Sequence, residues 1–94
     1  MTYKLGFHLS AKKEWDALEP QIKNQFKKKL LERIEEPRVE SARLNGMADC
    51  YKIKLRSIGY RLVYQVIDEQ ILITVVAVGK REKNKAYKAA IKRI

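Results

Sequence analysis

The chain has 94 residues, of which 46% are hydrophobic and 34% charged. This composition is too apolar for a disordered chain and too charged for a membrane protein, and the length suits one domain, residues 1–94. The formal net charge of +10 favours a polyanionic partner. Nucleic acid is the first expectation, and an acidic protein partner is the main competitor.

Two further observations concern the cellular setting. The longest apolar run, "ILITVVAV", is far shorter than the ~20 residues that a membrane-spanning helix needs. The first residues do not follow the pattern of a secretory signal, and the single cysteine, Cys50, can form no internal disulfide. We therefore expect a cytoplasmic protein without membrane contact.

The first half of the chain predicts one strand and two helices. Residues 3–9 alternate apolar and polar side chains, which indicates a strand, and Ser10 is placed to cap a short helix after it. Pro20 opens a second helix, in which an apolar residue recurs at every fourth position until Pro37 ends it. We expect the two helices to form an antiparallel hairpin. The charged outer face of the second could contact nucleic acid, although a solvated helix face is favoured.

The second half predicts three strands and a helix. After a loop over 37–49, strands are expected at about 51–56, 60–67 and 71–79, and Tyr87, Ala90, Ile91 and Ile94 then share one face of a last helix. The order β-α-α-β-β-β-α indicates an α+β fold. It has a mainly antiparallel four-stranded sheet, an N-terminal helical hairpin and a C-terminal helix. The position of the first strand in the sheet is not determined by the sequence.

Several kinds of chemistry lack the residues they need. His8 is the only histidine, so a pair of histidines cannot act as acid and base, and a zinc site is not expected. We expect His8 to be an ordinary residue at the end of the first strand. The chain also lacks a glycine-rich phosphate loop and a suitable carboxylate pair, so neither a cofactor nor a metal is expected.

The cationic side chains form a pattern on the predicted sheet. Lys52, Lys54 and Arg56 fall on one face of a strand whose other face is apolar, and Arg61 follows the next turn. Lys80 and Arg81 end the third strand of this group. Like charges that oppose each other on a sheet cost stability, so their gathering suggests a bound anion.

The segments "MADCYKIKLRSIGYRLVYQVID" and "VVAVGKREKNKAYKAAIKRI" resemble the RelE family of bacterial toxins, and the similarity extends over essentially the whole chain. The resemblance implies a RelE-like fold and a metal-independent endoribonuclease that cuts messenger RNA in the ribosomal A site. It places the catalytic set at Lys52, Lys54, Arg61, Arg81 and Tyr87. Contacts to RNA or the ribosome are expected from Arg43, Arg56 and Lys80. Members often carry serine just after "KRE", where this chain reads Lys83-Asn84, and no role is assigned there.

General chemistry suggests a role for each member of that set. Neighbouring cations lower the pKa of a lysine, so Lys54 is the expected base, with Lys52 sharing or supporting this role. Arg61 suits the non-bridging phosphate oxygens, and Tyr87 can stack on a base. Arginine is a poor proton donor, so Arg81 more naturally stabilises charge on the leaving oxygen than acts as general acid, but both readings stay open.

The resemblance also implies partners. It predicts a cognate RelB-like antitoxin, the ribosome and messenger RNA, with DNA reached only through the toxin–antitoxin complex. Two alternatives remain: a basic module that binds RNA or the ribosome without cutting it, and a ParE-like topoisomerase inhibitor on the same fold. Members of the latter group generally lack the lysine–arginine–tyrosine set.

Overall fold

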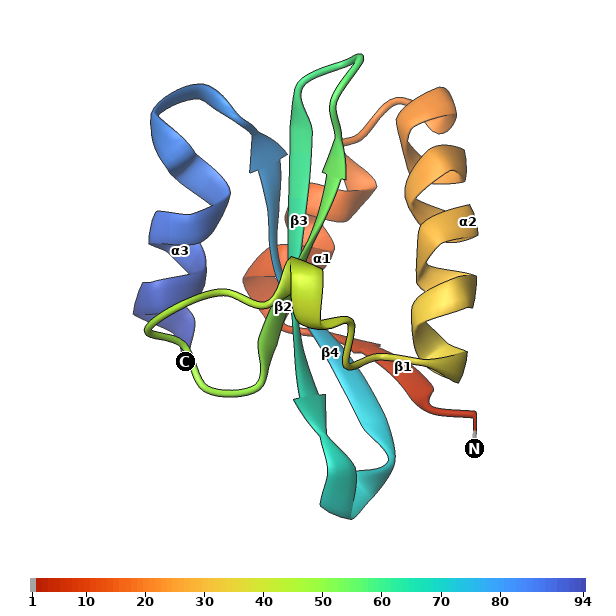
Figure 1. Cartoon of the computed structure of the whole chain (residues 1–94). Helices are drawn as coiled ribbons and strands as arrows, with labels where there is room; N and C mark the ends of the chain where they lie inside the picture. Colours follow the sequence, from red (N-terminus) through yellow and green to blue (C-terminus); the bar gives the residue numbers. More distant parts are fainter. Residues whose placement is uncertain (1) are drawn as a thin grey trace.

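One mixed sheet separates two helical layers (Figure 1). The computed structural model describes residues 2–82 and 84–94 in full, and the backbone of residue 83. The strands lie in the order β1-β4-β3-β2. The elements are β1 (Lys4–Phe7), α1 (Leu9–Asp16), α2 (Pro20–Glu35), β2 (Cys50–Leu55), β3 (Tyr60–Ile67), β4 (Leu72–Lys80) and α3 (Lys85–Arg93), with short 3-10 helices at Glu40–Ala42, Asp68–Gln70 and Glu82–Asn84. The α+β prediction and the order of its elements are confirmed.

The sheet is antiparallel except at one edge. β2 pairs with β3 and β3 with β4 in antiparallel register, whereas β1 lies parallel to β4, from Lys4 opposite Leu72 to Phe7 opposite Val75. The sequence left the place of β1 in the sheet open. Alternation of apolar and polar residues indicates that a segment is a strand, but it does not indicate which strand it pairs with.

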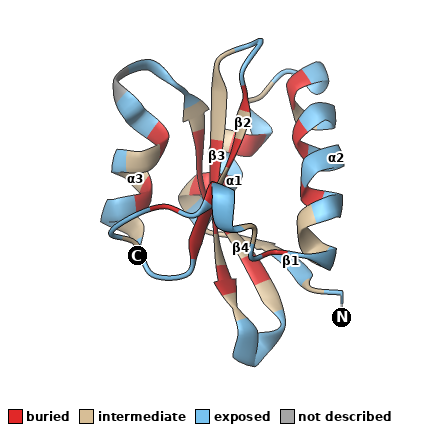
Figure 2. Cartoon of the chain, in the orientation of Figure 1, coloured by how far each residue is buried: buried red, intermediate tan, exposed pale blue. Residues whose placement is uncertain are grey.

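Each face of the sheet has its own apolar core, and consecutive residues of the central strands β3 and β4 are buried because they contribute to the two cores in turn (Figure 2). The larger core lies under α1 and α2, where Trp15 and Phe26 approach with ring centroids 6.2 Å apart. The smaller core lies under α3 and includes Val63, Ala77 and Ala90. Lys52 and Lys54 alternate with buried side chains of the larger core, so they project toward the α3 side.

The start of α1 differs from the prediction. Ser10 is not the cap: the helix begins at Leu9, and the Nδ1 atom of His8 accepts a hydrogen bond from the Ser10 backbone N–H at 3.2 Å. The reason is local, since His8 keeps the extended backbone of the preceding strand while its ring reaches the exposed N–H groups of the first turn. His8 thus caps a helix at the end of the strand.

The apolar face of α3 also differs. Ala86 and Ala90 are buried, whereas the side chains of Ile91 and Ile94 are 61% and 51% exposed. The small alanines allow the helix to lie close to the sheet, and this leaves the isoleucines outside the contact. The predicted helix is present, but its isoleucines do not belong to the core.

A β-bulge and an ion pair close the free edge of β4. The register shifts between Val63 and Tyr64, which leaves Val76 without an opposed residue. Arg93 donates a hydrogen bond to the Val76 carbonyl at 2.8 Å, and Glu14 accepts one from the Val78 N–H at 3.2 Å. Arg93 and Glu14 are themselves paired at 2.8 Å. This pair, the Glu14–Arg93 clasp, joins α1 and α3 around the edge that β1 does not cover.

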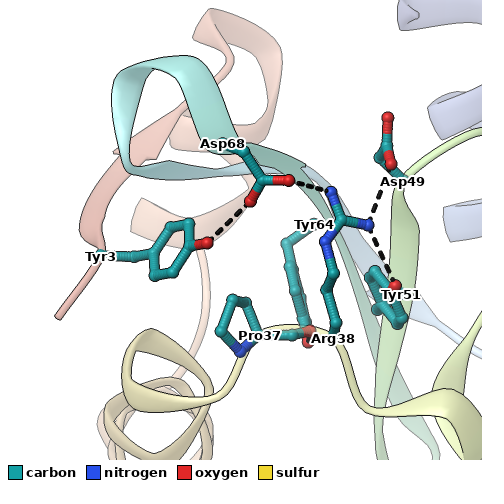
Figure 3. Close-up of polar contacts among 7 residues, drawn as sticks. All are labelled: Tyr3, Pro37, Arg38, Asp49, Tyr51, Tyr64 and Asp68. Atoms are coloured by element: carbon teal, nitrogen blue, oxygen red, sulfur yellow. Dashed lines mark hydrogen bonds and ion pairs between the residues drawn. The ribbon is translucent and has the colours of Figure 1, made fainter. Parts of the chain in front are cut away.

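The loop after α2 is held by a second polar network (Figure 3). Arg38 pairs with Asp49 at 3.0 Å and with Asp68 at 2.6 Å, and Asp68 also accepts a hydrogen bond from the Tyr3 hydroxyl. These contacts lower the pKa of Asp68, first through the Tyr3 hydroxyl and then through Arg38. Arg38 is therefore neutralised within the fold and does not add to the basic face.

Among the described residues, no helix is both long and apolar enough to cross a membrane.

Candidate active site

The predicted cationic residues meet in one pocket where the β2–β3 turn lies next to the end of β4. This hollow, the basic pocket, has a volume of about 160 Å³, room for several water molecules or a group of similar size. It is lined by Lys54, Leu55, Arg56, Gly59, Tyr60, Arg61 and Arg81. Its ionisable lining consists of cations and one tyrosine, without a carboxylate.

Strand pairing brings the first two cations together. Lys54 of β2 lies directly opposite Arg61 of β3 in the antiparallel register. Such opposed residues have Cβ atoms roughly 5 Å apart on the same face of a sheet. The sheet therefore holds two like charges side by side, which favours a bound anion between them.

The turn between β2 and β3 positions the third cation. The Arg81 N–H donates to the Gly59 carbonyl at 2.8 Å, so the end of β4 is attached to this turn. Gly59 has a φ of +69°, in the left-handed region that favours glycine, and the Arg81 side chain passes 3.9 Å from where a Cβ atom would stand. The turn thus sets the direction in which Arg81 enters the pocket.

The charges of the pocket alter the acidity of Lys54. Its pKa is lowered, chiefly by the charge of Lys52, with smaller contributions from burial and from Arg61 and Arg56. A lower pKa raises the fraction of neutral amine at neutral pH, which is the form that can accept a proton. This agrees with the role expected of Lys54 as a base.

Arg61 is held by two contacts from the start of α3. Its guanidinium carbon lies 4.8 Å from the centroid of the Tyr87 ring, and its Nη1 donates to the Asn84 Oδ1 at 2.7 Å. The Tyr87 hydroxyl is buried without a hydrogen-bond partner among the described residues, and burial raises its pKa. Arg61 covers one face of the Tyr87 ring in this structure, and the stacking of Tyr87 on a base stays a prediction.

The predicted site residues fall into three groups. Lys54, Arg56, Arg61 and Arg81 line the basic pocket. Lys52 and Tyr87 border it, one acting on Lys54 and the other beneath Arg61. Arg43 and Lys80 lie outside its lining.

The two outlying residues differ in their surroundings. Arg43 forms an isolated bridge with Tyr51 and lines a separate hollow with the loop that follows it. Lys80 lies opposite Tyr60 at the end of β4, and its side chain is exposed. The predicted RNA or ribosome contacts of both remain predictions.

Sequence reasoning missed four residues of the site. Leu55, Gly59 and Tyr60 line the pocket, and Asn84 binds Arg61. A signal was present for Gly59, since it closes the β2–β3 turn, and for Asn84, since asparagine often stands just before a helix. Neither signal indicates a contact with Arg61 or Arg81, because the partners are distant in sequence.

The described residues contain no group of three or more His, Cys, Asp or Glu side chains placed to hold a metal ion.

Comparison with known proteins agrees with this geometry. Residues 5–85 match the family described as the ParE toxin of the type II toxin–antitoxin system parDE. The chain is 56% identical, over 94 residues and 99% of the relative's length, to the mRNA interferase toxin RelE of Escherichia coli K12.

Solved structures give the same result. A mutant of E. coli toxin RelE in the free state matches with a TM-score of 0.92 and 55% identity, over 100% of this chain and 99% of that one. The toxin of the intact E. coli RelBE toxin–antitoxin complex matches with a TM-score of 0.83 and 57% identity, over 86% of this chain and 99% of that one. The chain therefore belongs to the RelE/ParE superfamily of toxins from type II toxin–antitoxin systems.

Proposed function

We propose that this chain is the toxin of a type II toxin–antitoxin system and a metal-independent endoribonuclease that cuts messenger RNA in the ribosomal A site. It acts in the cytoplasm as one 94-residue domain and so arrests translation. The observation that carries the proposal is the basic pocket, in which Lys54, Arg61 and Arg81 face one volume fit for a phosphate group. The relative at 56% identity is named an mRNA interferase toxin, which supports the same activity.

The pocket supplies what cleavage by a ribose hydroxyl needs. The neutral amine of Lys54, whose pKa is lowered by Lys52, takes the proton of the 2′-hydroxyl, and the 2′-oxygen attacks the adjacent phosphorus. The bond to the 5′-oxygen then breaks, which gives a 2′,3′-cyclic phosphate and, once water has delivered a proton, a free 5′-hydroxyl.

The two arginines stabilise the charge of this transition state. Arg61 binds the non-bridging oxygens, because its planar fork of N–H donors matches a phosphate. Arg81 stands at the leaving 5′-oxygen and stabilises its negative charge. Such a set has no imidazole and depends on strict alignment of the RNA. A ribosome-bound message supplies that alignment, which can contribute several kcal/mol.

A partner must restrain such a toxin. The E. coli relative forms the RelBE complex, and another solved structure pairs a mutant of that toxin with a peptide of the antitoxin RelB. We propose a RelB-like antitoxin for this chain, whose acidic groups meet its net charge of +10. Contact with DNA then comes through the complex of the two proteins.

Replacement of Lys54 by methionine tests the proposed reaction, because it keeps the length of the side chain and removes the base. On ribosomes that carry a defined message, Lys54→Met should cut about 10²- to 10⁴-fold more slowly than the unaltered chain, with ribosome binding retained. End-group analysis of the unaltered reaction should find a 2′,3′-cyclic phosphate and a 5′-hydroxyl.

A matched control is Lys28→Gln, which removes one exposed cation from α2 on the other side of the sheet and should leave the rate unchanged. The two alternatives give other results. A non-catalytic RNA- or ribosome-binding module would leave the message intact, and a ParE-like toxin would inhibit a topoisomerase instead.

A further inference from the structure

We propose that Asn84 is a positioning residue that orients the guanidinium of Arg61 for RNA cleavage, an inference that rests on the function proposed above. The contact is direct, since Arg61 Nη1 donates to Asn84 Oδ1 at 2.7 Å. Among the described residues the side chain of Arg61 makes no other hydrogen bond and no ion pair, and its second support is the Tyr87 ring at 4.8 Å. A long side chain with ~2 kcal/mol of rotamer entropy needs such contacts to keep one direction.

The hydrogen bond made by the Asn84 side chain is unusual for a residue at this position. Asn84 is the N-cap of α3, where asparagine normally accepts a hydrogen bond from the first turn of the helix. Here it makes no such bond, and its oxygen accepts from Arg61 instead. The Asn84 side chain therefore does not stabilise the first turn of α3, and it binds a residue of the basic pocket instead.

The backbone of Asn84 explains why the residue is an asparagine. Its φ of 54° and ψ of 38° lie in the left-handed region, which asparagine adopts more readily than most other residues with a side chain. This conformation occurs where the chain passes from β4 into α3, next to the pocket. The residue therefore combines an allowed backbone conformation with an acceptor that reaches β3.

The chemistry of the amide suits the role. A guanidinium has five N–H donors, so one bond to Asn84 fixes its plane and leaves other donors for a phosphate between Lys54 and Arg81. The amide oxygen is neutral, so it orients the cation without cancelling its charge. A carboxylate at this position would pair with Arg61 and repel an anionic substrate.

The test removes the amide and keeps the backbone. Asn84→Gly retains the left-handed conformation at no steric cost. In single-turnover cleavage of ribosome-bound message, the rate at saturating toxin should fall about tenfold, while the half-saturating concentration stays within about twofold. In an Arg61→Gln background, Asn84→Gly should cause no further loss, because the group that it positions is gone.

A second variant tests the need for a neutral acceptor. Asn84→Asp keeps the size of the side chain and its oxygen but adds a charge, and it should lose at least as much rate as Asn84→Gly. A rate equal to that of the unaltered chain would overturn the role given to the neutral amide.

A matched control separates this role from folding. Ile71 has a φ of 50° and stands in the turn between β3 and β4, at the opposite end of these strands from the pocket. Ile71→Gly makes the same kind of backbone change and should leave the cleavage rate unchanged. Thermal unfolding of each variant checks that its fold is retained.

Three results would overturn the proposal: equal losses from Asn84→Gly with and without Arg61, an effect on the half-saturating concentration alone, or a similar loss from Ile71→Gly. Failure of the unaltered chain to cut any ribosome-bound message would instead overturn the proposed function itself. The two failures are therefore distinct.

Discussion

The amine of Lys54 owes its lowered pKa first to Lys52, two residues earlier on the same strand. Only the neutral amine accepts a proton, so the cleavage rate should rise with pH and level off above the pKa that Lys54 has in the folded protein. Each cation that lowers this pKa moves the rise toward neutral pH. In the proposed mechanism Lys52 therefore acts through the pKa of Lys54 and needs no contact with the RNA.

Substitution of Lys52 tests this dependence. In Lys52→Gln the largest cause of the lowered pKa is lost, so the rising limb of the pH–rate profile should move to higher pH. Lys52→Arg keeps the charge and should leave the limb in place. The measurement is single-turnover cleavage over a range of pH, and coincident limbs for the two variants would exclude the proposed effect of charge.

The contacts of the site that the sequence predicted and those it missed differ in how far apart the two residues lie along the chain. The sequence placed Lys54 and Arg61 on successive strands joined by a short turn, and the register of the structure sets them opposite each other. The contact between Arg61 and Asn84 spans 23 positions and depends on where α3 docks. No periodicity encodes that docking, so Asn84 was missed.

At the scale of elements, the Glu14–Arg93 clasp joins helices from the two sides of the sheet. Glu14 is 33% exposed and Arg93 19%, so solvent weakens their pairing only in part. The same carboxylate satisfies the N–H of Val78 at the edge of β4. Loss of Glu14 would leave the Val78 N–H without an acceptor, and would leave Arg93 with the Val76 carbonyl but without its carboxylate.

We therefore expect Glu14→Ala to lower the free energy of unfolding by about 1–3 kcal/mol. Glu14→Gln keeps an acceptor for the Val78 N–H and loses only the charge, so its loss should be smaller. Chemical denaturation of the three proteins measures the difference. Equal stability of Glu14→Ala and the unaltered chain would show that the clasp does not hold α3.

The sequence also predicted elements better than their ends and edges. The apolar repeat of α2 and the alternation in β2 were sufficient to predict these two elements, because one face of each is buried along its whole length. The clasp was not predicted, because it depends on two features without a sequence signature. These are a bulge at Val76 and a strand β1 that ends at Phe7, opposite Val75.

For the whole molecule, charge is the property on which the proposed RNA binding most depends. The basic pocket contributes four cations, Lys54, Arg56, Arg61 and Arg81, to a chain whose net charge is +10. Each contact with a single-stranded phosphate releases counterions and adds about −0.7 to the slope of log affinity against log salt concentration. If all four pair with phosphates, the slope should be about −3.

The slope can be measured with a short RNA analogue that carries 2′-deoxyribose at the scissile position, since it cannot be cut. Arg56→Gln should make the slope less steep by about 0.7, whereas Lys28→Gln on the outer face of α2 should not change it. Equal effects of the two variants would mean that RNA does not select the basic pocket over the rest of the surface.

The basic pocket draws its residues from two parts of the chain, Lys54 to Arg61 and Arg81, and Arg61 rests on Asn84 and Tyr87 from the last quarter. A hairpin of β2 and β3 without β4 and α3 would thus lack Arg81 and both supports of Arg61, so the basic pocket is complete only when the chain has folded as far as Tyr87.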